Sequence, residues 1–172
     1  MGEPYGLNAV SLLTLGNTEQ AEAAAFKAAK LSDEIYYKNL LGLVYYSEEK
    51  YEMVPRELRA DSKDAFVLTL LAGAAFHNRD YASFGFFRDS VTALKGDNNG
   101  WVLFGAGAAA EKDLNWDIVL DKYKKCDADS DFIDPICLVA TVRTELRQIN
   151  YSDAKSDMDS ALSRYPKNHV VL

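Results

Sequence analysis

The fold is decided by the stretch at residues 151–166, which reads YSDAKSDMDSALSRYP. Its Tyr151, Ala154, Met158 and Ala161 are separated by gaps of three, four and three residues, and Pro166 follows five residues later. These gaps place the first four side chains on one stripe of an α-helix, with small residues where a neighbouring helix must come close. The helix is expected to end before Pro166, because the residue before a proline is disfavoured in the helical conformation.

The same ladder of spacings recurs upstream, which predicts a repeat rather than a single helix. It is repeated with the same gaps by Trp116, Val119, Tyr123, Cys126 and Asp131. It returns without the leading aromatic residue at Ala21, Ala25, Ala28 and Asp33, and more loosely at Tyr51, Val54 and Leu58.

A second pattern, a small residue flanked by large ones, stands between the ladders and predicts a partner helix packed at close range. Its instances are Leu41-Gly42 followed by Tyr45, Ala72-Gly73 followed by Phe76, and Trp101 with Gly105 and Ala108. Together the two patterns resemble the tetratricopeptide repeat, which reads Trp-x2-Leu-Gly-x2-Tyr, then Ala-x3-Phe, then Pro, at about 34 residues per unit.

This resemblance implies an all-α fold, a right-handed α-solenoid of about five helix-turn-helix pairs. The expected units are approximately residues 3–34, 35–63, 64–97, 98–132 and 133–168, within a single domain over 1–172. Pro55 falls inside the second helix of the second unit, so the local curvature there stays open. The apolar end at 169–172 predicts either that the array continues in a longer chain or that this end docks on something.

In this family the first helix of each pair lines a concave face, and the resemblance implies that a protein partner binds there. With the small residues as register, the predicted partner-binding groove consists of Tyr36, Asn39, Leu43, Tyr46, Val67, Leu70, His77, Asn99, Val102, Ala106, Arg143, Leu146 and Arg147. The set is mostly small or apolar, with a basic end at the two arginines, which favours an amphipathic helix or an apolar extended segment as ligand. Tyr36 and Tyr46 are the expected anchors. For Val67, Leu70 and Val102 the alternative is interior packing.

Charge and hydropathy exclude several classes of partner. Nineteen basic and twenty-six acidic residues give a net charge of −7, which repels nucleic-acid phosphates and anionic membrane surfaces. The longest apolar runs, near residues 66–76 and 101–110, are too short to cross a bilayer. Two cysteines are too few for a secreted disulfide scaffold, so a cytoplasmic location is expected.

The sequence offers little for metal binding or catalysis, and we expect no enzyme activity, no cofactor and no metal. Asp127, Asp129 and Asp131 have the alternate spacing of a calcium loop, but phenylalanine stands where the loop requires glycine and Leu138 where a glutamate should close it. We expect a solvated turn in which Asp131 or Asp134 caps the helix beginning at Pro135.

The cysteines and histidines also have simpler interpretations. Cys126 and Cys137 are eleven residues apart across a turn and can approach one another, but we expect buried, inert thiols. His77 and His169 stand near helix ends, where a favourable interaction with the helix dipole is expected.

The leading hypothesis is a scaffold or adaptor that binds a helical or extended segment in the concave groove. The alternative is a structural subunit of a larger complex or homo-oligomer, packed through its ends and convex face, without a free groove. The apolar carboxyl end motivates this alternative, and the sequence leaves the oligomeric state open.

Overall fold

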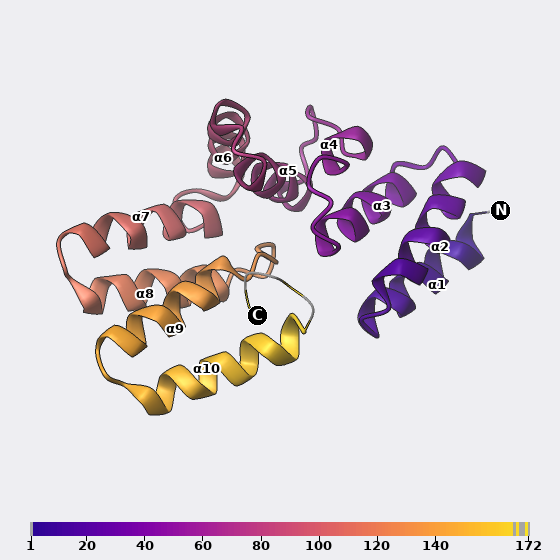
Figure 1. The fold of residues 1–172 in the computed structure, drawn as a ribbon. Coiled ribbons are helices and arrows are strands. Elements are labelled where there is room, and N and C mark those ends of the chain that lie inside the picture. Colours follow the sequence, from indigo (N-terminus) through magenta and orange to yellow (C-terminus); the bar gives the residue numbers. More distant parts are fainter. Residues whose placement is uncertain (1, 167, 169–170, 172) are drawn as a thin grey trace. The chain divides into compact units, whose positions relative to one another are not determined.

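The structure is a computed structural model that describes residues 2–166, 168 and 171 (Figure 1). These residues form ten helices and no strand, which confirms the predicted all-α fold. In chain order the helices are α1 (Glu3–Thr14), α2 (Thr18–Leu31), α3 (Ile35–Ser47), α4 (Val54–Glu57), α5 (Ala65–His77), α6 (Tyr81–Lys95), α7 (Gly100–Lys112), α8 (Trp116–Asp127), α9 (Ile136–Arg147) and α10 (Tyr151–Arg164). His169 and most of the apolar end at 169–172 lie outside the described residues.

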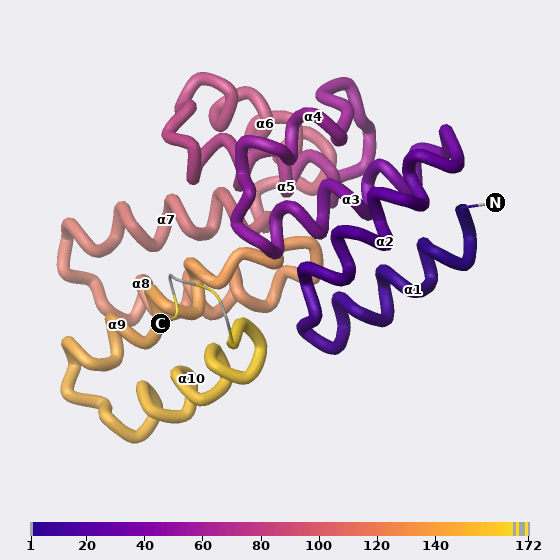
Figure 2. Tube along the Cα trace, turned by 45° about the vertical axis from the view of Figure 1, so that its right-hand side comes forward, coloured from indigo at the N-terminus to yellow at the C-terminus, as the bar shows by residue number. Residues whose placement is uncertain are grey.

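Residue contacts divide the chain into two compact units, unit 1 (Met1–Phe87) and unit 2 (Arg88–Leu172), with the boundary inside α6. The single domain over 1–172 therefore stays a prediction. Within unit 2, α7, α8, α9 and α10 lie side by side with their directions alternating (Figures 1 and 2).

Unit 1 is held together by small residues that admit large neighbours. In α2 the predicted ladder of Ala21, Ala25 and Ala28 is fully buried. A Cβ atom on Gly6 of α1 would lie 2.6 Å from the ring of Tyr37 in α3, so glycine is needed for this close approach. Alanine and glycine thus bring these helices together at short range.

The second helix of the second pair is reduced to the four residues of α4. Pro55 stands in the first turn of α4, where its missing N–H donor is tolerated, and it prevents the helix from beginning earlier, because its ring would clash with the carbonyl group four residues back. The apolar side chains of the predicted ladder, Tyr51, Val54 and Leu58, are nevertheless buried. The packing pattern is kept here although most of the helix is not.

In unit 2 the inner positions of the predicted ladders lie in the core. Val119, Tyr123 and Cys126 of α8 are fully buried. In α10, Ala161 packs with Leu138 of α9 and with Val171 near the carboxyl end. The leading Tyr151, in contrast, is exposed.

All five turns that follow α1, α3, α5, α7 and α9 have the same backbone conformation. The residue with positive φ in each is Gly16, Glu49, Arg79, Leu114 or Ile149. Its N–H group donates to the carbonyl group three residues back, and the next N–H group donates to the carbonyl group five residues back. This is the Schellman motif, which prefers glycine at the left-handed position, yet only the first turn has one.

The β-branched Ile149, at φ 62°, should make its turn the most strained of the five. Its side chain is exposed, so little packing is lost on replacement. We expect Ile149→Gly to stabilise the protein by about 1 kcal/mol, because glycine adopts this conformation freely. The measurement is the urea midpoint at unchanged slope.

A matched control is Ile118→Gly in α8, where the isoleucine is also exposed but lies inside a helix. There the same substitution should destabilise by about 1 kcal/mol. Equal shifts in both variants would contradict the assignment of strain to the turn at Ile149.

Candidate functional site

Two neighbouring stripes in unit 2 form the best-defined candidate surface, here called the α7–α9 surface. It consists of Phe104, Ala108 and Glu111 on α7 and Val139, Arg143, Leu146 and Arg147 on α9. Phe104, Ala108 and Glu111 are spaced by four and three residues, as are Val139, Arg143 and Leu146, so each set lies on one helix face.

The two stripes are joined by direct contacts. The Arg143 Nη2 atom donates to the Glu111 Oε1 atom at 2.9 Å, and the Arg147 Nη1 atom donates to Oε2 at 3.2 Å. Further along, Phe104 packs against the buried cluster of Val119, Tyr123 and Ala140, which links α7 through α8 to α9.

Glu111 is the electrostatic centre of this surface, with only 19% of its side chain exposed. Burial alone would raise its pKa, but hydrogen bonds from Tyr123 and Arg143 outweigh burial, and the pKa lies below its usual value. The Tyr123 hydroxyl group donates to Glu111 at 2.8 Å. Burial is the main cause of the raised pKa of Tyr123, and the neighbouring Glu111 carboxylate raises it further. A single ionised carboxylate therefore anchors both arginines at neutral pH.

The two guanidinium groups remain accessible although they are anchored. The side chains of Arg143 and Arg147 are 54% and 48% exposed, and each guanidinium has more N–H donors than its bond to Glu111 uses. The Arg147 guanidinium also lies 5.9 Å from the centre of the Trp116 ring. Beside them, Phe104, Ala108 and Val139 are half-buried and Leu146 is exposed. The surface thus presents guanidinium donors beside apolar side chains.

Small residues on α7 leave room next to this surface. A Cβ atom on Gly105 would meet no atom within 4 Å, and Ala109 is exposed. The backbone of α7 is therefore accessible at this position.

The predicted groove residues of unit 2 divide into surface and interior. Arg143, Leu146 and Arg147 are exposed, and Val102 and Ala106 are half-buried. Asn99 is 1% exposed: its Oδ1 atom accepts the N–H group of Val102, and its amide nitrogen donates to the carbonyl oxygen of Gly96. The Asn99 side chain therefore caps α7 instead of offering a binding surface.

In unit 1, Tyr36 is 55% exposed, and Asn39, Leu43 and His77 are half-buried. Tyr46, Val67 and Leu70 are buried, which agrees with the interior alternative for Val67 and Leu70. The ring of Tyr46 occupies the space where Gly73 has no side chain, and it meets Tyr51 edge to face at 5.3 Å. Tyr46 is thus a packing residue in this structure, not a free anchor.

The predicted groove set lacks four residues of this surface: Phe104, Ala108, Glu111 and Val139. The register set by the small residues of α7 predicts Val102 and Ala106 on the groove face instead. Glu111 could have been found as the only acidic residue of α7, lying on the same stripe as Phe104.

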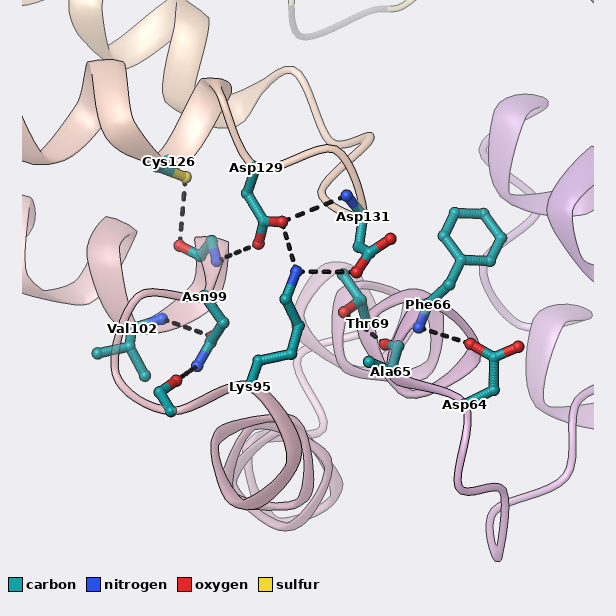
Figure 3. Close-up of polar contacts among 12 residues, drawn as sticks. Asp64, Ala65, Phe66, Thr69, Lys95, Asn99, Val102, Cys126, Asp129 and Asp131 are labelled. Atoms are coloured by element: carbon teal, nitrogen blue, oxygen red, sulfur yellow. Dashed lines mark hydrogen bonds and ion pairs between the residues drawn. The ribbon is translucent and has the colours of Figure 1, made fainter.

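Asp129 and Asp131 of the 127–134 turn accept hydrogen bonds from Lys95 (Figure 3). Lys95 donates to Asp129 at 2.5 Å and to Asp131 at 2.8 Å, and the Gly100 N–H group donates to Asp129 at 2.8 Å. Asp134 accepts the N–H group of Ile136, but α9 begins at Ile136, one residue later than predicted, and its cap position is Pro135. Among the described residues no group of three or more histidine, cysteine, aspartate or glutamate side chains is placed to hold a metal.

The structure corrects the prediction for the two cysteines. Cys126 and Cys137, expected as inert thiols, are joined in a disulfide with their Cα atoms 6.0 Å apart. Fold-back of α9 against α8 brings them together, which their spacing allowed but did not require. Within the described part of the chain, no helix is long and apolar enough to span a bilayer.

Comparison with known proteins finds similarity in three-dimensional structure but not in sequence. No protein-family model and no curated protein matches the sequence. The structure is similar to that of YrrB, described as a TPR protein with an unusual peptide-binding site. The TM-score is 0.54 at 18% identity, over 99% of this chain and 90% of that one. It is also similar to PilF of Pseudomonas aeruginosa, with a TM-score of 0.53 at 18% identity over 97% of this chain and 78% of that one. With the ten helices of its described residues in the order of five successive pairs, the chain has the fold of the tetratricopeptide repeat proteins.

Proposed function

We propose that this chain is a protein-interaction module that binds a short segment of a partner protein on the α7–α9 surface. One observation carries the proposal: the half-exposed guanidinium groups of Arg143 and Arg147 are anchored by one largely buried carboxylate, Glu111, beside half-buried apolar side chains. Pre-positioned donors next to an apolar strip suit recognition, because little side-chain freedom is lost on binding. The peptide-binding site described for YrrB, which has a similar fold, supports the same class of ligand.

The partner segment is expected to supply an apolar side chain to the strip of Phe104, Ala108 and Val139. It is expected to offer a carboxylate to Arg143 and Arg147, since a guanidinium group pairs well with a carboxylate. Either a helix or an extended segment can place these two groups next to each other. A groove that continues through the predicted residues of both units stays a prediction.

The test begins with a displayed library of random peptides selected against the full chain. For the peptides selected, the double variant Arg143→Ala/Arg147→Ala is expected to bind at least about tenfold more weakly by calorimetry, because charge-assisted hydrogen bonds are lost. Lys155→Ala, which removes an exposed charge from α10, is the control and should bind like the parent. Equal affinity of the double variant and the parent would remove this surface from consideration.

The structural-subunit alternative loses part of its motivation. Val171, the residue of the apolar end that the structure describes, is buried against Leu138 and Ala161. Light scattering over a wide concentration range distinguishes the two functions, since a permanent homo-oligomer would give the mass of several chains throughout. The cytoplasmic location stays a prediction, and the Cys126–Cys137 disulfide weighs against it because disulfides persist in oxidising compartments.

A further inference from the structure

The disulfide lies where three helices of unit 2 meet. Cys126 is in the last turn of α8 and Cys137 in the first turn of α9. The sulfur atom of Cys126 is also 3.2 Å from the carbonyl oxygen of Gly100, the first residue of α7. Two of these helices, α7 and α9, carry the α7–α9 surface.

Near this point α9 is held against α8 by a buried apolar cluster, and further along by an ion pair between Lys124 and Glu145 at 2.8 Å. The residue of α9 that packs with Val119 and Tyr123 is Ala140, which contributes a single methyl group. Both cysteines are fully buried beside this contact. A covalent bond here adds a direct constraint between the end of α8 and the start of α9.

We propose that Cys126 and Cys137 are a redox-controlled staple that fixes the geometry of the α7–α9 surface. Its oxidant is a low-molecular-weight disulfide such as glutathione disulfide. The role of the staple in partner binding rests on the proposed function, whereas its chemistry does not.

The reaction is ordinary thiol–disulfide exchange. One cysteine thiolate attacks a sulfur atom of glutathione disulfide, which breaks that S–S bond, forms a mixed disulfide and releases one glutathione thiolate. The second cysteine thiolate then attacks the protein sulfur of the mixed disulfide and releases the other glutathione. Two protein thiols are oxidised, one glutathione disulfide is reduced to two thiols, and the two cysteine protons go to the products.

Both redox states are compatible with the fold. In the reduced state the Cys126 thiol can donate to the Gly100 carbonyl group, which lies at a suitable distance for a sulfur donor. Because both sulfur atoms are buried, exchange requires the α8–α9 connection to open. The oxidised form is therefore protected from small thiols while the protein stays folded.

The first experiment equilibrates the full chain in glutathione buffers of graded redox potential, quenches it with acid, alkylates it under denaturing conditions and measures the intact mass. In oxidising buffer we expect a mass lower by two hydrogens, with neither an alkyl group nor glutathione attached. Alkylation of both cysteines, or glutathione on either of them, would overturn the proposal. Cys137→Ala provides the control, because its remaining cysteine, Cys126, can be alkylated or carry glutathione but cannot form this disulfide.

The second experiment compares hydrogen exchange of the parent chain in its two redox states, so no variant has to fold. Amides of α9 are expected to exchange about tenfold or more slowly in the oxidised form, because the bond restricts opening of this helix. Helix α3 in unit 1 is the internal reference and should be unchanged. Identical exchange of α9 in both states would refute the staple. Neither measurement uses a partner, so failure here is distinct from failure of the peptide-binding test.

Discussion

Replacing Gly107 with alanine is expected to destabilise the protein by about 2 kcal/mol, although alanine is the better helix former. A Cβ atom at this position of α7 would lie 2.5 Å from Cε1 and 2.7 Å from Cδ1 of Tyr123. The Tyr123 ring has no room to withdraw, since it is fully buried and its hydroxyl group is bonded to Glu111. The measurement is the free energy of unfolding in urea, followed by the fluorescence of the two tryptophans, Trp101 and Trp116, both of which lie in unit 2.

The matched control is Gly105→Ala, two residues away in the same helix. A Cβ atom there meets no atom within 4 Å, so only the intrinsic helix preference changes. This variant should be more stable than the parent by about 0.5–1 kcal/mol. If both variants shift stability in the same direction, the contact of Gly107 with Tyr123 does not govern the packing of α7 on α8.

This pair of glycines shows how far the sequence could reach. The spacing of Trp101, Gly105 and Ala108 correctly predicted a helix that packs at close range. It assigned the contact to Gly105, whereas the structure assigns it to Gly107. Glycine and alanine occupy so many positions of α7 that the composition does not distinguish the packed face from the exposed one. The ladders of α8 and α10 carry a single small or aromatic stripe, and there the predicted core positions Val119, Tyr123 and Ala161 are buried.

The candidate site was predictable only in part, for a related reason. Arg143 and Arg147 could be placed at a surface because a charged side chain is seldom buried without a partner. Nearly every residue of α5 is apolar, so its sequence has no apolar stripe that would mark the buried face of the helix. Val67 and Leu70 could therefore not be assigned to the interior from the sequence, and the structure has both buried. Glu111 belongs to the site through contacts with residues 32 and 36 positions further along the chain, which no local pattern reports.

The second large effect is expected for Asp129→Ala, which should destabilise the protein by about 2–3 kcal/mol. The Asp129 carboxylate is nearly buried and accepts from the Lys95 ammonium group at the end of α6 and from the Gly100 N–H group at the start of α7. Burial lowers the pKa of Lys95, but its bonds to Asp129 and Asp131 outweigh burial and raise it. Alanine leaves the Gly100 donor and a largely buried ammonium group with fewer partners, and an unsatisfied buried polar group is costly.

Asp97→Ala is the control for this prediction. It removes an exposed carboxylate from the same α6–α7 connection and should change the unfolding free energy by less than about 0.5 kcal/mol. Asp129→Asn separates charge from hydrogen bonding, because the amide oxygen can still accept from Gly100 while the ion pair with Lys95 is lost. The stability of this variant should fall between that of the parent and that of Asp129→Ala. If Asp129→Ala unfolds at the same urea concentration as Asp97→Ala, the 127–134 turn is only a solvated connection. If it unfolds much earlier, the turn holds the start of α7 in place, and with it the helix that carries Glu111.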